Sequence, residues 1–154
     1  MKRFIGFAMA LFIGMAAMSC VEDSDTGNNG SDYLDVTPNN ISGVWRMESY
    51  DNGVALEEGS YYYLELIRKD KKFVIYDNLE SMNSRKRTGR FDIETNSAAV
   101  IFGVFDNDFG LGDWEHRYYV RDLTEERMVW VATDDEEIVM VFVRSELPEE
   151  WQEK

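Results

Sequence analysis

The chain has 154 residues, of which 44% are hydrophobic and 14% aromatic, so it holds enough apolar material for the core of one domain and is not globally disordered. It contains one cysteine, which excludes a disulfide scaffold and a zinc site built from thiolates. Thirty acidic and sixteen basic residues give a net charge of −14, which argues against nucleic acid as a partner.

Residues 1–19 are predicted to be a signal peptide. Lys2 and Arg3 precede an apolar run over residues 4–18, which is shorter than the roughly 20 residues that a membrane span needs. The run ends at Ser19-Cys20, and this junction resembles the lipobox of bacterial lipoproteins. The resemblance implies cleavage after Ser19 and acylation of Cys20, with chains such as palmitate, at the outer membrane. An ordinary signal peptide followed by a chance cysteine is the alternative.

Residues 20–40 are predicted to be the lipidated cysteine and a flexible acidic tether. The stretch over residues 22–25 is mostly acidic, and residues 26–32 contain no apolar side chain. An acidic run directly after the cysteine resembles the surface-export signal of Bacteroidetes lipoproteins, which favours display on the cell surface over a periplasmic location. Since the chain is acidic, we expect the lipid alone to contact the membrane.

Residues 41–147 are predicted to form an all-β domain, followed by a short tail over residues 148–154. Short runs of alternating apolar and polar residues are separated by turn residues, a pattern typical of an antiparallel meander. The predicted strands are residues 44–50, 61–68, 73–76, 89–95, 98–104, 114–121, 128–133 and 138–144. Eight such strands are expected to close into an up-and-down barrel, which is either filled or roomy enough for one small ligand.

The two ends of this domain carry a resemblance to the lipocalins. Gly43-Val44-Trp45 resembles their Gly-x-Trp signature, and Arg144 ends the last predicted strand. In a closed antiparallel barrel the first and last strands are neighbours, so Trp45 and Arg144 should meet. The resemblance implies that Arg144 covers Trp45 and closes one end of the barrel. In layout, the domain is similar to small lipocalin-like domains of Bacteroidetes lipoproteins, which implies a cup for a small apolar molecule.

Alternation along the strands identifies side chains that should face the lumen. His116 is the only histidine, which excludes a metal site built from several histidines, and a hydrogen-bonded wall residue is its simplest role. Ordinary core packing is the alternative for the whole set. The ligand-binding candidates are Tyr62, Trp114, His116, Tyr118, Met128, Trp130 and Met140.

Three further segments carry residue types that occur in binding sites. Residues 106–113 offer oxygen ligands but do not fit an EF-hand, because Leu111 stands where glycine is needed, so a loop or lid is expected. The basic run over residues 84–87 is expected to be solvated. Tyr61 and Tyr63 should share the outer face, where they suit carbohydrate, a protein interface or local packing.

These observations predict a non-enzymatic, membrane-anchored lipocalin-like binding protein for a small apolar or amphipathic molecule. No cofactor and no metal are expected. The alternative is an envelope lipoprotein whose filled barrel serves as a structural or interaction module for another envelope protein. A hydrolase or isomerase based on His116 is a weaker third reading, because spacing assigns it no catalytic partner. An open, mostly apolar lumen would favour the binding protein over the filled barrel.

Overall fold

The computed structural model describes residues 33–81, 83–106 and 111–152. All of them belong to one compact unit, Ser31–Lys154. The predicted signal peptide, Cys20 and most of the predicted tether therefore lie outside the described residues.

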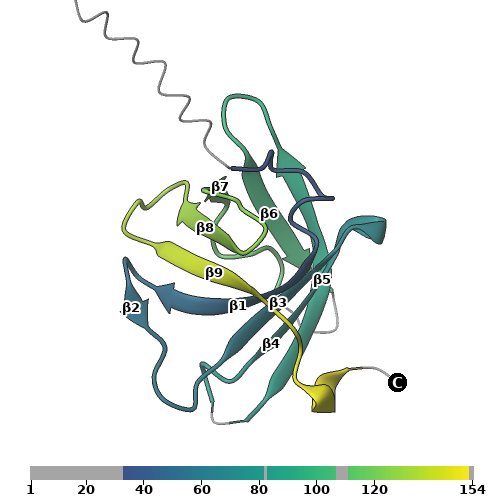
Figure 1. Cartoon of the computed structure of the whole chain (residues 1–154), viewed down its shortest axis with the longest axis vertical. Helices are drawn as coiled ribbons and strands as arrows, with labels where there is room; N and C mark the ends of the chain where they lie inside the picture. Colours follow the sequence, from purple (N-terminus) through teal and green to yellow (C-terminus); the bar gives the residue numbers. More distant parts are fainter. Residues whose placement is uncertain (1–32, 82, 107–110, 153–154) are drawn as a thin grey trace, which may run out of the picture. The chain divides into compact units, whose positions relative to one another are not determined.

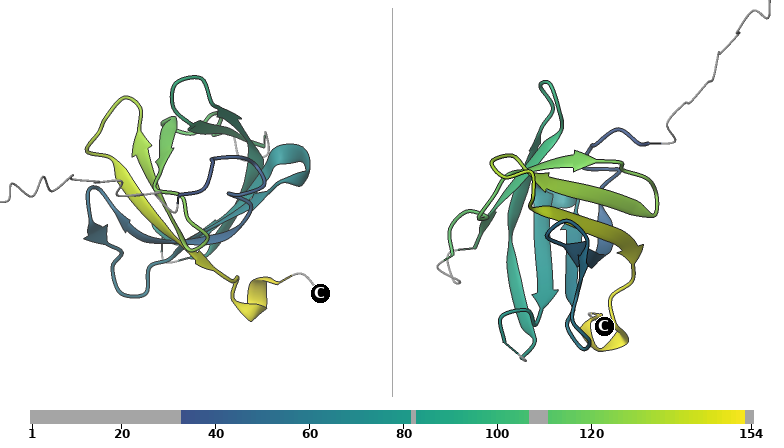
Figure 2. Two further views of the ribbon diagram at one scale, coloured as in Figure 1. Left: turned by 45° about the horizontal axis from the view of Figure 1, so that its top comes forward. Right: turned by 90° about the vertical axis from the view of Figure 1, so that its left-hand side faces the viewer.

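Nine antiparallel strands form one sheet within the described residues, in the order β2-β1-β3-β4-β5-β6-β7-β8-β9. Pairing of β1 with β9 closes eight of them into a barrel, and the short β2 pairs only with the end of β1 (Figures 1 and 2). The predicted all-β, eight-stranded closed meander is confirmed. The strands are β1 (Gly43–Tyr50), β2 (Val54–Ala55), β3 (Tyr62–Ile67), β4 (Lys72–Asp77), β5 (Arg85–Glu94), β6 (Val100–Phe105), β7 (Tyr118–Arg121), β8 (Arg127–Ala132) and β9 (Val139–Ser145).

β2 was not predicted, and two strands begin four residues away from their predicted starts, whereas the other boundaries agree within two residues. β5 begins at Arg85 rather than at residue 89, because the basic run pairs with β4 through Asp77↔Arg85 and Ile75↔Arg87. β7 begins at Tyr118 rather than at residue 114, and it pairs with β6 at only two positions. Residues 114–117 therefore run as a loop along the wall between β6 and β7.

The last part of the predicted tether packs against the barrel. The amide of Leu34 donates to the carbonyl of Leu123 over 2.7 Å, and the side chains of Leu34 and Val36 lie against the core. Ile41 is fully buried. Residues 34–40 are thus not part of a free tether, because their apolar side chains gain burial against the domain.

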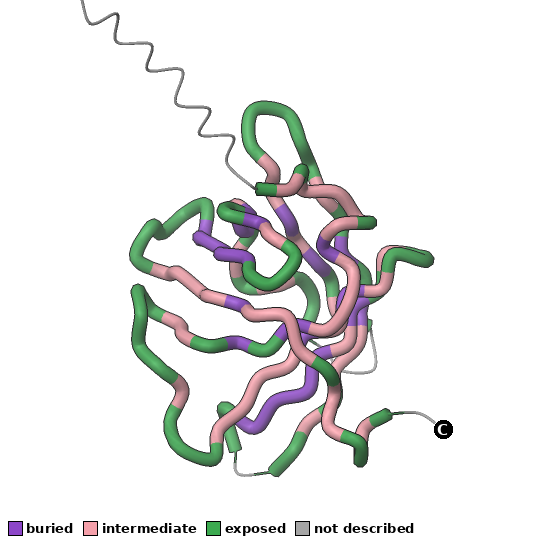
Figure 3. Tube along the Cα trace, viewed as in Figure 1, coloured by how far each residue is buried: buried purple, intermediate pink, exposed green. Residues whose placement is uncertain are grey.

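The core fills the half of the barrel where β1 starts and β9 ends. Figure 3 shows buried segments running through the strands, and the buried set includes Trp45, Leu64, Phe73, Met128 and Phe142. These side chains come from β1, β3, β4, β8 and β9, so one continuous apolar core ties the sheet together.

Two 3-10 helices flank the strands. Lys69–Lys71 joins β3 to β4, and Glu149–Trp151 follows β9. Trp151 stacks on Tyr76, with ring centroids 5.2 Å apart, and also packs against Tyr61 and Tyr63. The outer tyrosines are therefore partly covered by the C-terminal segment, which supports the local-packing reading. No helix among the described residues is long and apolar enough to cross a membrane.

Candidate ligand-binding site

Trp45 and Arg144 close one end of the barrel, where the sequence predicts that they meet. Trp45 and Arg144 are direct partners across β1 and β9, and the Arg144 guanidinium carbon lies 3.7 Å from the Trp45 ring centroid. The guanidinium also donates to the carbonyls of Asn40, Ser42 and Glu125 over 2.7–3.3 Å. The Trp45 indole nitrogen donates to the carbonyl of Ile41. The Trp45 indole nitrogen and all three Arg144 guanidinium nitrogens thus donate to backbone carbonyls.

A cavity of about 660 Å³ occupies the opposite end of the barrel. Tyr50 at the end of β1 and Met140 at the start of β9 line this cavity. The cavity therefore lies at the ends of these two strands that are farther from the Trp45–Arg144 pair. Its wall is mainly apolar and aromatic, and it includes Met47, Leu56, Ile75, Phe105, Ile138 and Met140. The barrel is therefore packed at one end and hollow at the other.

Six of the seven predicted lumen residues line this cavity: Tyr62, Trp114, His116, Tyr118, Trp130 and Met140. Met128 does not. It is fully buried in the core, two positions along β8 from Trp130 and paired with Phe142. Its inward direction followed from alternation, but alternation does not tell how far along the barrel axis a residue lies.

Trp114 forms the boundary between the filled and the hollow parts. Its ring lies 5.0 Å from Phe73 and 5.5 Å from Trp130, centroid to centroid. It rests on Gly103 of β6, where a Cβ atom would overlap the indole. The glycine therefore makes room for a large ring inside the barrel, and this ring limits how deep the cavity reaches.

His116 lies at the cavity mouth as a hydrogen-bonded wall residue. Its Nδ1 is 2.9 Å from Oδ1 of Asp134, on the turn between β8 and β9, and its ring contacts Tyr118 edge-on. Burial, with the Glu115 and Asp134 carboxylates nearby, raises the pKa of Tyr118 to about 12. Burial also raises the pKa of Tyr62, against a lowering effect of Arg87. Both phenols are thus uncharged at neutral pH.

A buried ionic cluster beside the cavity was not predicted from the sequence. Asp77 is fully buried and accepts hydrogen bonds from Arg85 over 2.5 Å and from Arg87 over 2.6 Å. Arg87 also lies over the Phe105 ring and lines the cavity. The prediction that residues 84–87 are solvated is wrong for these two arginines, because each neutralises the same buried carboxylate.

A signal for this cluster was present in the sequence. Residues 73, 75 and 77 share one phase, and Phe73 and Ile75 face inward, so Asp77 should also face inward. Residues 85, 87, 89 and 91 share the inward phase of Phe91 in the same way. A carboxylate and two guanidinium groups in phase with core residues on neighbouring strands predict a buried ion pair.

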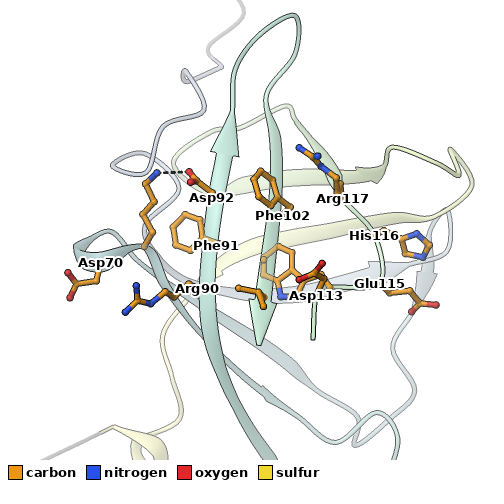
Figure 4. Close-up of a pocket in the computed structure, with 13 residues that line it drawn as sticks. Asp70, Arg90, Phe91, Asp92, Phe102, Asp113, Glu115, His116 and Arg117 are labelled. Carbon is orange, nitrogen blue, oxygen red and sulfur yellow. Dashed lines mark hydrogen bonds and ion pairs between the residues drawn. The ribbon is translucent and has the colours of Figure 1, made fainter. Parts of the chain in front are cut away.

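A second hollow of about 630 Å³ lies on the outer side of β5 and β6, against residues 113–117. Figure 4 shows Asp70 and Arg90 at one edge and Arg117 at the other. Lys71 pairs with Asp92, and Arg117 covers the ring of Phe102 at 4.4 Å. Lys71 and Asp92 thus pair within the hollow, whereas Arg117 and His116 pair with Glu94 and Asp134 outside it. Of the predicted lid loop, residues 106–113, positions 107–110 lie outside the described residues.

No protein-family model matches the chain, and no curated protein matches it significantly. Among the described residues, no group of three or more His, Cys, Asp and Glu side chains is placed to hold a metal ion.

Proposed function

We propose that this protein is a membrane-anchored, lipocalin-like binding protein that holds a small apolar or amphipathic molecule without chemical conversion. The observation that carries this proposal is the cavity of about 660 Å³ above a sealed barrel end. Sites for small molecules typically have volumes of about 300–1,000 Å³ and mostly apolar walls with a few polar groups. The volume lies in this range, and the wall is mainly apolar and aromatic by residue, with polar side chains that include Arg87, His116 and the carboxylates of Asp51, Glu57 and Glu115.

The filled-barrel alternative accounts for only half of the lumen. Trp130 packs against Trp114 on one side and against Phe142 on the other. The half of the barrel next to the Trp45–Arg144 pair is therefore filled, as that alternative requires. The cavity beyond Trp114 has no counterpart in a filled barrel. A structural or interaction module for an envelope protein therefore ranks second.

The anchoring part of the proposal rests on the sequence. Several acyl chains on Cys20 would hold the protein at the outer membrane, since each buried methylene contributes about 0.8 kcal/mol. The acidic run after Cys20 favours the outer surface. We expect Cys20→Ala to move the protein from the membrane to the soluble fraction, whereas Ser24→Ala should stay with the membrane. An unchanged membrane fraction for Cys20→Ala would contradict the anchor.

The binding function is tested by native mass spectrometry of residues 31–154 purified from the bacterial host without denaturation. We expect a retained mass of a few hundred daltons, within the range that such a cavity accommodates. The same protein should bind the apolar dye 1-N-phenylnaphthylamine. A bare polypeptide mass together with no dye binding would favour the filled-barrel alternative.

Matched variants locate the binding. Met140→Trp adds a large ring to the cavity wall, and we expect it to weaken dye binding at least about tenfold by excluding the ligand volume. Val54→Trp adds the same ring on β2 at a position that is 50% exposed, and it should bind the dye like the unchanged protein. Equal loss in both variants would place the dye elsewhere.

A further inference from the structure

The cavity wall contains buried hydrogen-bond donors that have no acceptor. Within the described residues, four buried side-chain atoms lack a hydrogen-bond partner, and all are N–H groups: Nε of Arg85 and Arg87, and Nε1 of Trp114 and Trp130. Three of these residues, Arg87, Trp114 and Trp130, line the lumen cavity. Buried polar groups are normally paired, so three unmatched donors around one cavity indicate what its occupant supplies.

Two of these donors are the indole N–H groups of neighbouring side chains. Trp114 and Trp130 are neighbours whose ring centroids lie 5.5 Å apart, and Trp130 is only 3% exposed. Tryptophan has a donor and no acceptor, so only an acceptor can satisfy it. By contrast, the indole of Trp45 at the sealed end already donates to Ile41. Among the buried tryptophans of the described residues, only the two that line the cavity thus lack a hydrogen-bond acceptor.

The charges around the cavity disfavour an anionic ligand. Arg87 is already paired with buried Asp77, and Arg85, which shares that carboxylate, also pairs with Glu80, so two carboxylates balance the two arginines. Among the described residues that line the cavity, the other Asp, Glu, Lys and Arg side chains are all acidic, namely Asp51, Glu57 and Glu115. An anion would therefore pass carboxylates at the mouth and meet an arginine whose charge is already compensated.

We propose, on the basis of the proposed binding function, that the cavity selects uncharged apolar molecules bearing a hydrogen-bond-accepting oxygen, such as a ketone, ester or ether. Trp114 and Trp130 donate to that oxygen, and the apolar wall holds the rest of the molecule. Both indole nitrogens are covered by protein, so the acceptor reaches them through side-chain adjustment of the kind that commonly accompanies binding.

Three probes of similar shape test this proposal by equilibrium dialysis against residues 31–154, the compact unit that contains every described strand. 2-Acetylnaphthalene carries a ketone, 2-isopropylnaphthalene replaces it with a hydrocarbon group, and 2-naphthoate carries a negative charge. We expect the ketone to bind about three- to tenfold more tightly than the hydrocarbon, as one added hydrogen bond allows. The carboxylate should bind most weakly.

Conservative variants assign the donors. Trp114→Phe and Trp130→Phe remove the N–H group and keep an aromatic ring, so each should lower the ketone-to-hydrocarbon affinity ratio while changing hydrocarbon binding less than about twofold. Trp151→Phe makes the same chemical change on the outer wall, and it should leave the ratio unaltered. An unaltered ratio in both cavity variants would overturn the role of the indoles.

The possible failures are distinguishable. Equal binding of the ketone and the hydrocarbon would overturn the selection for an acceptor and leave the apolar binding function intact. Tighter binding of the carboxylate would overturn the selection for uncharged molecules. Binding of none of the three probes, together with no binding of 1-N-phenylnaphthylamine, would overturn the proposed binding function itself.

Discussion

Arg144 joins three segments that are far apart in the sequence. It pairs with Trp45 across β1 and β9, donates to Asn40 and Ser42 before β1, and donates to Glu125 before β8. Burial lowers the pKa of its guanidinium, which reflects how far the group is removed from water. The carbonyl partners and the indole face replace the lost hydration.

Arg144→Ala is expected to destabilise the domain by roughly 2–4 kcal/mol, because it removes a cation–π contact and takes the donor away from the part-buried carbonyls of Asn40 and Ser42. Arg144→Lys should recover only part of this, since an ammonium cannot reach three carbonyls in the same fork. Urea unfolding measures both. Arg121→Ala, which removes an exposed arginine lying over Tyr119, is the control and should cost under about 0.5 kcal/mol. Equal midpoints for Arg144→Ala and the unchanged protein would contradict this role.

Tyr62 and Tyr118 should make the stability fall at high pH. Burial raises the pKa of both phenols in the folded state, that of Tyr118 to about 12, whereas an unfolded tyrosine titrates near 10. Above pH 10 the unfolded chain loses these protons first. Stability is therefore complete below pH 10 and declines towards pH 12, by up to about 1.4 kcal/mol per pH unit for each tyrosine.

Urea unfolding between pH 8 and pH 11 measures this decline. Tyr118→Phe should show a shallower slope because it has no phenol to titrate, and Tyr33→Phe, at a position that is 55% exposed, should match the unchanged protein. Identical slopes in all three proteins would show that Tyr118 does not titrate differently on folding.

At the level of the elements, alternation predicts faces better than boundaries. The inward positions of Tyr118, Trp130 and Met140 are correct, because successive side chains of a strand point to opposite faces and the phase of each strand carries over its whole length. The start of β5 was missed because Arg85 and Arg87 interrupt that apolar period, although they point inward to Asp77. The extra length assigned to β7 arose because the loop at residues 114–117 keeps the same parity.

The short helix Glu149–Trp151 packs against the outer wall of the barrel through Trp151. Trp151 stacks almost parallel on Tyr76, at an interplanar angle of 4°, and Tyr76 is only 5% exposed. Trp151→Ala should therefore destabilise the domain by about 1–3 kcal/mol and change the near-ultraviolet circular dichroism of the tyrosines. Trp151→Phe keeps an aromatic contact and should retain most of the stability. An unchanged spectrum and midpoint in Trp151→Ala would mean that the segment does not stay docked in solution.

At the scale of the whole molecule, the sequence predicts that the barrel closes but not how full it is. Closure follows from eight alternating strands and from Trp45 and Arg144 at their two ends. The extent of the cavity depends on three-dimensional volumes, such as the space that Gly103 leaves for Trp114. Nothing in the alternation of single strands reports those volumes. Six of the predicted lumen residues therefore line the cavity, whereas Met128 faces inward but lies in the filled core.

Net charge makes a further prediction for the whole molecule. With thirty acidic and sixteen basic residues, repulsion between carboxylates opposes the compact state, and salt screens it more than it screens the buried pairs around Asp77. Raising sodium chloride from 10 to 500 mM should increase the melting temperature by about 2–4 °C. Replacing Glu136 and Glu137 by lysine within the exposed turn before β9 reduces the repulsion, so this variant should respond less to salt. A melting temperature that falls with salt would show instead that ion pairs such as Arg117–Glu94 dominate the surface electrostatics.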